Sequence, residues 1–132
     1  MLFVPGQTAF FDVDDTLVLW RDPGTGAAPV PGLPFPAWAH REHLELLVKL
    51  RGVGYAIVVW SHGGADWAAR VVEALDIASL VSVVCAKPSV WFDDHADPTK
   101  ILGPQTHRYL GVNPHDESGP IAPEPAYIGG WY

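Results

Sequence analysis

The apolar positions of this chain gather in short runs separated by amphipathic segments, a pattern typical of α/β proteins. Continuous apolar runs predict buried strands at residues 7–11, 55–60, 80–85 and, in a shorter form, 90–92. Leu, Val and Ala side chains at helical spacing predict helices over residues 37–50, which Pro36 would open, and 65–75. Because strands alternate with helices, we expect an α/β fold: a three-layer Rossmann-like parallel sheet with helices on both faces.

Proline and glycine mark the segments outside these elements. Residues 22–36 contain five Pro and three Gly, which predicts a loop rather than a folded insertion. Weaker patterns indicate short helices at residues 99–102 and 105–110. From residue 111 onwards, four Pro and four Gly favour an extended tail. We therefore divide the chain into a core, residues 1–110, and a C-terminal tail, residues 111–132.

Polar side chains follow each predicted strand at the point where it ends. In chain order these side chains are Asp12, Asp14 and Asp15, then Ser61 and His62, then Lys87, then Asp93 and Asp94. In parallel sheets, ligands bind beyond the carboxyl ends of the strands. Side chains alternate along extended backbone, so Asp12 and Asp14 would point the same way. Two carboxylates this close favour a cation between them, and Mg²⁺ suits oxygen ligands.

These clusters carry a resemblance to a known family. The segment Phe10-Phe11-Asp12-Val13-Asp14-Asp15-Thr16-Leu17 resembles motif I of the haloacid dehalogenase-like (HAD) phosphohydrolases, an apolar strand followed by DxDxT[LV]. In the family's order, Ile57-Val58-Val59-Trp60-Ser61 resembles motif II, Lys87 motif III, and Val90-Trp91-Phe92-Asp93-Asp94 motif IV. The resemblance covers roughly residues 7–97. Only five residues separate Lys87 from Asp93, and a Pro/Gly loop follows motif I, so the resemblance implies a member with no cap domain.

The resemblance implies roles for four of the acidic residues, in catalysis or in metal binding. Asp12 would attack phosphorus and form an aspartyl-phosphate, which divides one displacement into two easier steps. Asp14 would protonate the leaving oxygen and then activate water. Asp12, the backbone carbonyl of Asp14, and Asp93 would hold Mg²⁺. Asp94 would be a further ligand or an outer anchor of the metal site, and the cap of a helix explains it equally well.

The resemblance also implies a set of groups that bind the phosphoryl oxygens and the substrate. Lys87 would offset the negative charge of the phosphoryl group, although an ordinary surface lysine is the alternative. Ser61 would donate a hydrogen bond to a phosphoryl oxygen, and it could also cap the following helix. The amides of His62 and Gly63 precede that helix, where anions bind. Thr16 would contact the substrate, and the side chain of His62 is either a substrate contact or a solvated loop residue.

Several aromatic and histidine residues lie outside the motifs. Trp20, Arg21, Trp38 and Arg41 flank the Pro-rich loop, where an aromatic ring and a guanidinium could stack on a base or simply pack on a helix. Trp60 and Trp91 are predicted to lie in the core. The histidines, which include His40 and His43, show no spacing typical of a zinc site.

Composition limits the class of function. The net charge of −7 disfavours a broad nucleic-acid surface, since such binding depends on Lys and Arg. No signal peptide or membrane-length apolar run is present, which favours a cytoplasmic protein without a membrane partner.

We therefore expect a Mg²⁺-dependent phosphomonoester phosphatase that acts through an aspartyl-phosphate. Nucleotides or nucleic-acid ends are the favoured phosphorylated substrates, and oligomerisation is left open. The alternative is a catalytically silent HAD-fold module that binds phosphate or a partner. A receiver-like phospho-acceptor domain is disfavoured, because its acceptor Asp would stand after a middle strand, where this chain has Ser61.

Overall fold

The computed structural model describes residues 6–95, 97, 109–111 and 113–115 of the 132-residue chain. The chain divides into two compact units, Met1–Lys87 and Pro88–Tyr132, and each is described by itself. All helices and strands among the described residues belong to the first unit.

The first unit is built on a three-stranded parallel sheet. Its strands are β1 (Thr8–Asp12), β4 (Ala56–Ser61) and β5 (Val83–Ala86), in the order β1-β4-β5. The α/β class and the first two predicted strands are thereby confirmed. The third strand begins later than predicted, because Ala78–Leu80 form a short 3-10 helix, η1, before β5.

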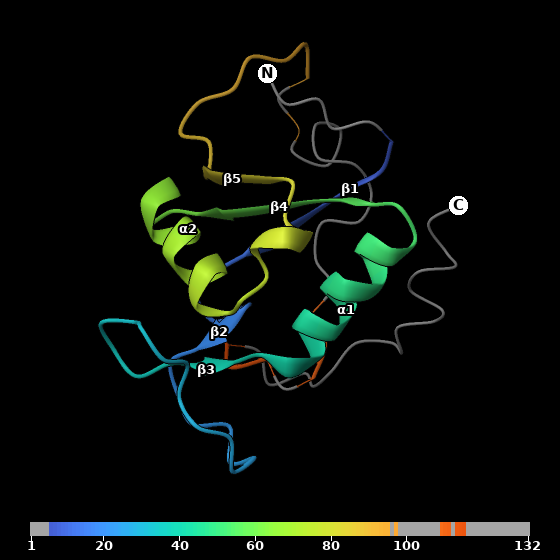
Figure 1. The fold of residues 1–132 in the computed structure, drawn as a ribbon. Helices are drawn as coiled ribbons and strands as arrows, with labels where there is room; N and C mark the ends of the chain where they lie inside the picture. The colour runs from blue at the N-terminus through green and yellow to red at the C-terminus, as the bar shows by residue number, and fades with distance from the viewer. Residues whose placement is uncertain (1–5, 96, 98–108, 112, 116–132) are drawn as a thin grey trace. The chain divides into compact units, whose positions relative to one another are not determined.

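Two helices cover one side of this sheet. α1 (Arg41–Gly52) connects β1 to β4, and α2 (Ala65–Ala74) connects β4 to β5. Figure 1 shows both helices on the same side of the strands. This follows from the strand order, since two right-handed crossovers that step in the same direction place their helices on one face. The predicted helices on both faces are thus not seen in the described part of the chain.

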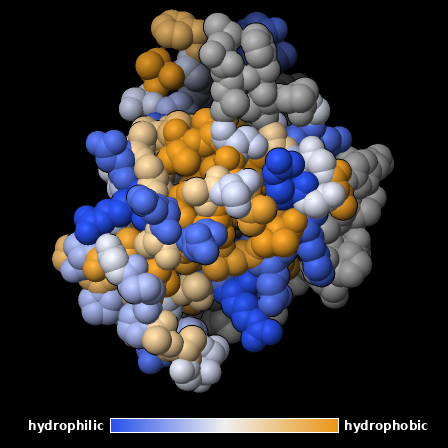
Figure 2. All heavy atoms as spheres, viewed as in Figure 1, coloured by the Kyte–Doolittle hydropathy of each residue, from blue (hydrophilic) through white to orange (hydrophobic). Residues whose placement is uncertain are grey.

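Burial along the strands follows the positions of the helices. On β1, Ala9 and Phe11 are buried, whereas Phe10 between them is 52% exposed. Ile57 and Val59 pair with Ala9 and Phe11 on β4 and are fully buried. Figure 2 shows apolar residues gathered around η1, between α1 and α2, with hydrophilic residues around them. The apolar core of this unit therefore lies between the helices and one face of the sheet.

Helix α1 begins four residues later than its apolar spacing predicts. Trp38–Ala39 form β3, which pairs antiparallel with β2 (Val18–Leu19). Backbone pairing requires extended conformation, so the helix begins only at Arg41. The ribbon of β2 and β3 brings together the two ends of the Pro-rich loop, and that loop contains no helix or strand, as predicted.

In the second unit, the predicted strand at residues 90–92 is wrong. Val90, Trp91 and Phe92 have no strand conformation and are 69%, 49% and 95% exposed, so Trp91 is not a core residue. A three-residue apolar run forms a strand only when a neighbouring strand satisfies its backbone groups, and no strand pairs with it among the described residues. The predicted helix at 99–102 and most of that at 105–110 lie outside the described residues, and Tyr109 and Leu110 are buried without helical conformation.

Neither α1 nor α2, the α-helices of the described residues, has the length and hydrophobicity needed to cross a bilayer.

Candidate active site

The turn that follows β1 is fixed by its own backbone. The carbonyl of Val13 accepts N–H groups from Thr16, Leu17 and Val18 at 3.2, 3.0 and 3.2 Å. Asp15 adopts a left-handed conformation with φ of 56°, which Asp tolerates better than most residues. Its Oδ1 accepts the backbone N–H of Trp20 at 3.2 Å. Asp15 therefore has a structural role, and the turn has one defined shape.

The carboxylate of Asp12 is held on both oxygens at the carboxyl end of β1. Lys87 Nζ lies 3.0 Å from Oδ1, and the Thr16 hydroxyl donates to Oδ2 at 3.2 Å. The ammonium of Lys87 also lies 5.9 Å from the centroid of the Trp60 ring. The side chains of Lys87 and Asp12 are 23% and 31% exposed, so solvent still reaches this pair. The structure thus brings Lys87 of predicted motif III together with Asp12 and Thr16 of predicted motif I at one strand edge.

Ser61 is fully buried at the carboxyl end of β4 and organises the turn before α2. Its Oγ accepts the N–H of Gly63 at 2.9 Å, and its carbonyl accepts the N–H groups of Gly64 and Lys87 at 3.2 and 3.0 Å. The predicted capping role for Ser61 is wrong, because α2 begins at Ala65 with Gly64 as its cap residue. The amides of Gly63 and Gly64 are already hydrogen-bonded to Ser61 within this turn. The side chain of His62 is exposed.

Asp14 has a partner that lies 53 residues further along the chain. The indole Nε1 of Trp67, in the first turn of α2, donates to Asp14 Oδ1 at 3.1 Å. Trp67 also packs on the turn before its helix, where a Cβ at Gly63 would lie 3.0 Å from its Cδ1. A larger residue at position 63 would press on the indole and on Ser61 Oγ, so glycine suits the close packing beside Asp14.

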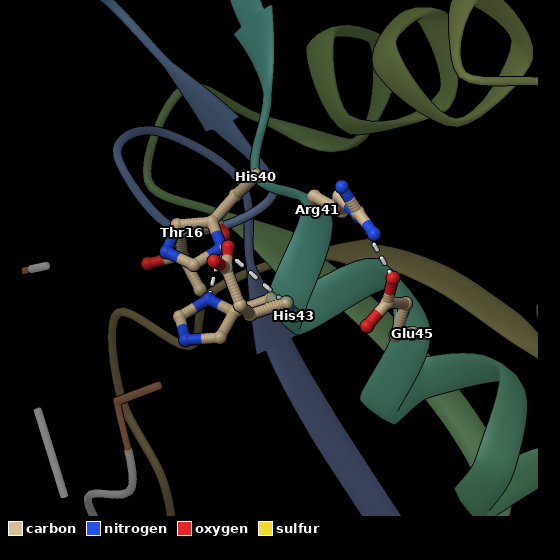
Figure 3. Close-up of polar contacts among 6 residues, drawn as sticks. Thr16, His40, Arg41, His43 and Glu45 are labelled. Carbon is tan, nitrogen blue, oxygen red and sulfur yellow. Dashed lines mark hydrogen bonds and ion pairs between the residues drawn. The ribbon is translucent and has the colours of Figure 1, made fainter. Parts of the chain in front are cut away.

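The backbone carbonyl of Thr16 is linked to a buried histidine pair (Figure 3). His43 Nδ1 lies 2.7 Å from the carbonyl of Thr16, so this nitrogen carries the proton and donates it. The ring of His43 stacks on that of His40 with centroids 3.7 Å apart and an angle of 7°. His40 Nδ1 accepts the backbone N–H of His43 at 3.3 Å and so caps α1. The pair thereby attaches the turn after β1 to the start of α1.

The protonation of His43 is shifted by this environment. Burial lowers the pKa of His43 from 6.5 to about 4, and the neighbouring His40 adds to the effect, while the bond to Thr16 opposes it. Figure 3 also shows Arg41, whose Nε donates to Glu45 at 2.9 Å on the exposed side of the same helix. That hydrogen bond raises the pKa of the Arg41 guanidinium.

The oxygen donors of the turn suit Mg²⁺, but the described residues supply few of them. The Asp12 carboxylate and the backbone carbonyl of Asp14 are the predicted donors, and no group of three metal-ligating side chains occurs among the residues that the structure describes. Mg²⁺ commonly binds one or two carboxylates and keeps several waters, so this donor set fits the ion. Asp93 and Asp94 belong to the second unit, where Asp93 Oδ1 accepts the N–H of His95 at 2.9 Å. Their part in a metal site therefore stays a prediction.

A shallow hollow of about 300 Å³ lies elsewhere, between α2, η1 and β5. It is lined by Ala69, Val72, Glu73, Ala78, Val81, Ser82, Val83 and Val84, none of which belongs to the candidate site. Among the described residues, those of the candidate site therefore lie at the strand ends and not in this hollow.

Comparison of the chain with models of protein families, with curated proteins and with solved structures finds no match. Interpretation of the site therefore depends on its own geometry. Sequence reasoning missed Trp67 and His43, since no local pattern relates either residue to the turn after β1.

Proposed function

We propose that this protein is a Mg²⁺-dependent phosphomonoester phosphatase that acts through a phosphorylated Asp12. The observation that carries the proposal is the position of the Asp12 carboxylate, between the ammonium of Lys87 at 3.0 Å and the hydroxyl of Thr16 at 3.2 Å. A phosphate monoester resists a carboxylate nucleophile because both are negatively charged, so catalysis needs fixed positive charge beside the nucleophile.

In the first step, a carboxylate oxygen of Asp12 would attack phosphorus as the ester oxygen leaves. Lys87 would then turn from Asp12 towards the phosphoryl oxygens, where negative charge concentrates. The hydroxyl of Ser61 supports the same step. Its oxygen already accepts the N–H of Gly63, which leaves its proton to donate. Because Ser61 is fully buried, the turn after β4 would have to open for this proton to reach a phosphoryl oxygen.

Proton transfer is assigned to Asp14. Its Oδ1 is held by the indole of Trp67, which leaves Oδ2 to give a proton to the leaving oxygen. In the second step the same oxygen would take a proton from water as that water attacks phosphorus and the bond between phosphorus and the Asp12 oxygen breaks. The product is inorganic phosphate, and both carboxylates return to their initial states.

Asp12 and the backbone carbonyl of Asp14 would hold Mg²⁺, which supplies further positive charge for the phosphoryl oxygens. Participation of Asp93 and Asp94, substrate contacts by His62, membership of the HAD family, the three-layer capless architecture and a cytoplasmic location are parts of the same proposal. The roles of Asp93 and Asp94, the family and the absence of a cap rest on the resemblance of the motifs. The three-layer architecture rests on the alternation of strands and helices, the contact by His62 on its place beside Ser61, and the location stays an expectation from the sequence.

The test is phosphate release from a panel of phosphomonoesters by the full chain, with Mg²⁺ and with EDTA. We expect Mg²⁺-dependent turnover and its complete loss in Asp12→Asn. The matched control is Asp76→Asn, since Asp76 is exposed and has a φ of 57° that Asn also adopts. Turnover retained by Asp12→Asn would refute the proposal. If the folded wild-type protein hydrolyses none of the substrates in the panel, the result would favour a module that binds phosphate without hydrolysis.

A further inference from the structure

Three aromatic side chains contact one another in a row that begins beside Asp14, and we call them the aromatic wall: Trp67, Trp20 and Phe35. Trp67 stacks with Trp20 at a centroid distance of 6.0 Å and an angle of 14°. Trp20 meets Phe35 edge-on at 6.1 Å and 69°. Since Trp67 also donates to Asp14 Oδ1 at 3.1 Å, the wall is attached directly to the proposed proton-transfer group.

The outer member of the wall is exposed and yet held in place. Phe35 is 63% exposed, so the protein gains little of the free energy available from burying this ring. Pro34 and Pro36 flank it, and proline restricts both its own backbone and that of the residue before it. The backbone that carries this exposed ring is therefore restricted before any ligand binds. A ligand that stacks on the ring would lose little affinity to the ordering of the loop.

Further contacts hold the loop that carries Phe35. The N–H of Val30 donates to the carbonyl of Ala37 at 2.7 Å, and Arg70 Nη2 donates to the carbonyl of Gly32 at 3.4 Å. Arg70 lies on α2, the helix that also carries Trp67. The loop and the helix are therefore tied together on the side of the site where the aromatic wall stands.

We propose that the aromatic wall binds a flat aromatic ring carried by the leaving group of a small phosphomonoester. The inference rests on the proposed phosphatase function, and it names the substrate class of that site. Aromatic side chains stack on any planar ring system, so a purine base and a simple aryl group share the chemistry that the wall recognises. The net charge of −7 favours a small substrate over a nucleic-acid chain, whose phosphates need many basic side chains.

The first experiment compares two substrates that differ only in the aromatic ring. Adenosine 5′-monophosphate and ribose 5-phosphate present the same primary phosphoester, and 4-nitrophenyl phosphate serves as the aryl probe. We expect Phe35→Leu, which keeps apolar bulk but removes the ring, to raise KM about tenfold for both aromatic substrates. Kinetics on ribose 5-phosphate should not change. Phe35→Tyr restores a ring and should behave as wild type.

The control variant is Val53→Ala, which truncates a side chain that is 55% exposed at the end of α1 and outside the site. It should leave KM for all three substrates unchanged. If Phe35→Leu changes KM equally for adenosine 5′-monophosphate and ribose 5-phosphate, or changes neither, the wall does not bind the ring. In that case the phosphatase proposal still stands on the turnover itself.

A binding measurement tests the aromatic wall independently of phosphate hydrolysis. Adenosine lacks the phosphate, and we expect it to quench the tryptophan fluorescence of the wild-type protein saturably and that of Phe35→Leu about tenfold more weakly. If no substrate is turned over but this difference is found, the phosphatase proposal fails and the aromatic wall is supported. If adenosine binds neither protein and KM shows no preference for the aromatic substrates, the inference is overturned.

Discussion

Acidification should destabilise this protein through one buried side chain, His43. In the folded chain its pKa is lowered to about 4, whereas in the unfolded chain it should be near 6.5. Below pH 6.5 the unfolded chain therefore binds a proton that the folded chain excludes. The resulting stability is fully present above pH 6.5 and is lost as the pH falls towards 4, with no further loss from this group below that.

The size of the effect follows from the two pKa values. The step from 6.5 to about 4 corresponds to about 3 kcal/mol of unfolding free energy at roughly 1.4 kcal/mol per pKa unit. Between pH 7.5 and 4.5 most of this is realised, about 2.5 kcal/mol. Glu42 Oε2, 3.5 Å from His40 Nδ1, is the acidic group that could attract a proton to the stacked pair, and it would reduce the loss.

The assay is urea unfolding at several pH values for wild type and His43→Asn. Asn places an amide N–H where Nδ1 stands, so it can keep the bond to Thr16 without titrating in this range. A pH dependence that comes from groups unaffected by the substitution cancels in the difference. We expect the free energy of unfolding of wild type, relative to that of the variant, to fall by about 2.5 kcal/mol between pH 7.5 and 4.5. If the free energies of unfolding of the two proteins change in parallel with pH, the pKa of His43 is not lowered by folding.

Three further predictions concern the turn and the core. Trp67→Phe removes the N–H donor to Asp14, and kcat for ribose 5-phosphate should fall about tenfold in steady-state assays, as expected for one hydrogen bond to a carboxylate; an unchanged kcat would show that this bond does not orient the proton-transfer group. Asp15→Val should have a free energy of unfolding about 1–2 kcal/mol lower than that of Asp15→Gly in urea titrations, because a β-branched residue is strained at φ of 56°. Equal stability of the two variants would mean that the turn relaxes around the valine. Leu47→Ala should cost about 2–5 kcal/mol in the same assay and Val48→Ala much less, since Leu47 is fully buried and Val48 is 50% exposed; similar losses would contradict this packing.

The predictions from sequence succeeded where the signal is local. The apolar run that ends at Trp60 predicts β4 closely, because an unbroken β-branched and aromatic run of this length, bounded by Gly54 and Gly63, is typical of a strand buried on both faces. The prediction of α2 is equally close, since its apolar positions recur with helical period. The start of α1 at Arg41 could not be predicted in this way. It depends on the pairing of β3 with β2, which joins residues about twenty positions apart.

The predictions failed where an element needs a partner that the local sequence does not specify. Residues 90–92 have the composition of a strand, but they do not form one among the described residues. The prediction that helices cover both faces of the sheet failed for a similar reason. Both crossovers step in the same direction, so α1 and α2 share one face, and no periodicity in either helix indicates that choice.

By itself the sequence determined the α/β class, the strands β1 and β4, and the placing of Asp12, Ser61 and Lys87 at strand ends. These features follow from hydrophobic periodicity and from the order of residues along the chain, which are local properties. Tertiary structure alone decided which side chains meet. Trp67 reaches Asp14 across 53 positions, and His43 reaches Thr16 across 27. Such contacts depend on how a helix packs against a turn, and packing is a property of the whole fold rather than of any one segment.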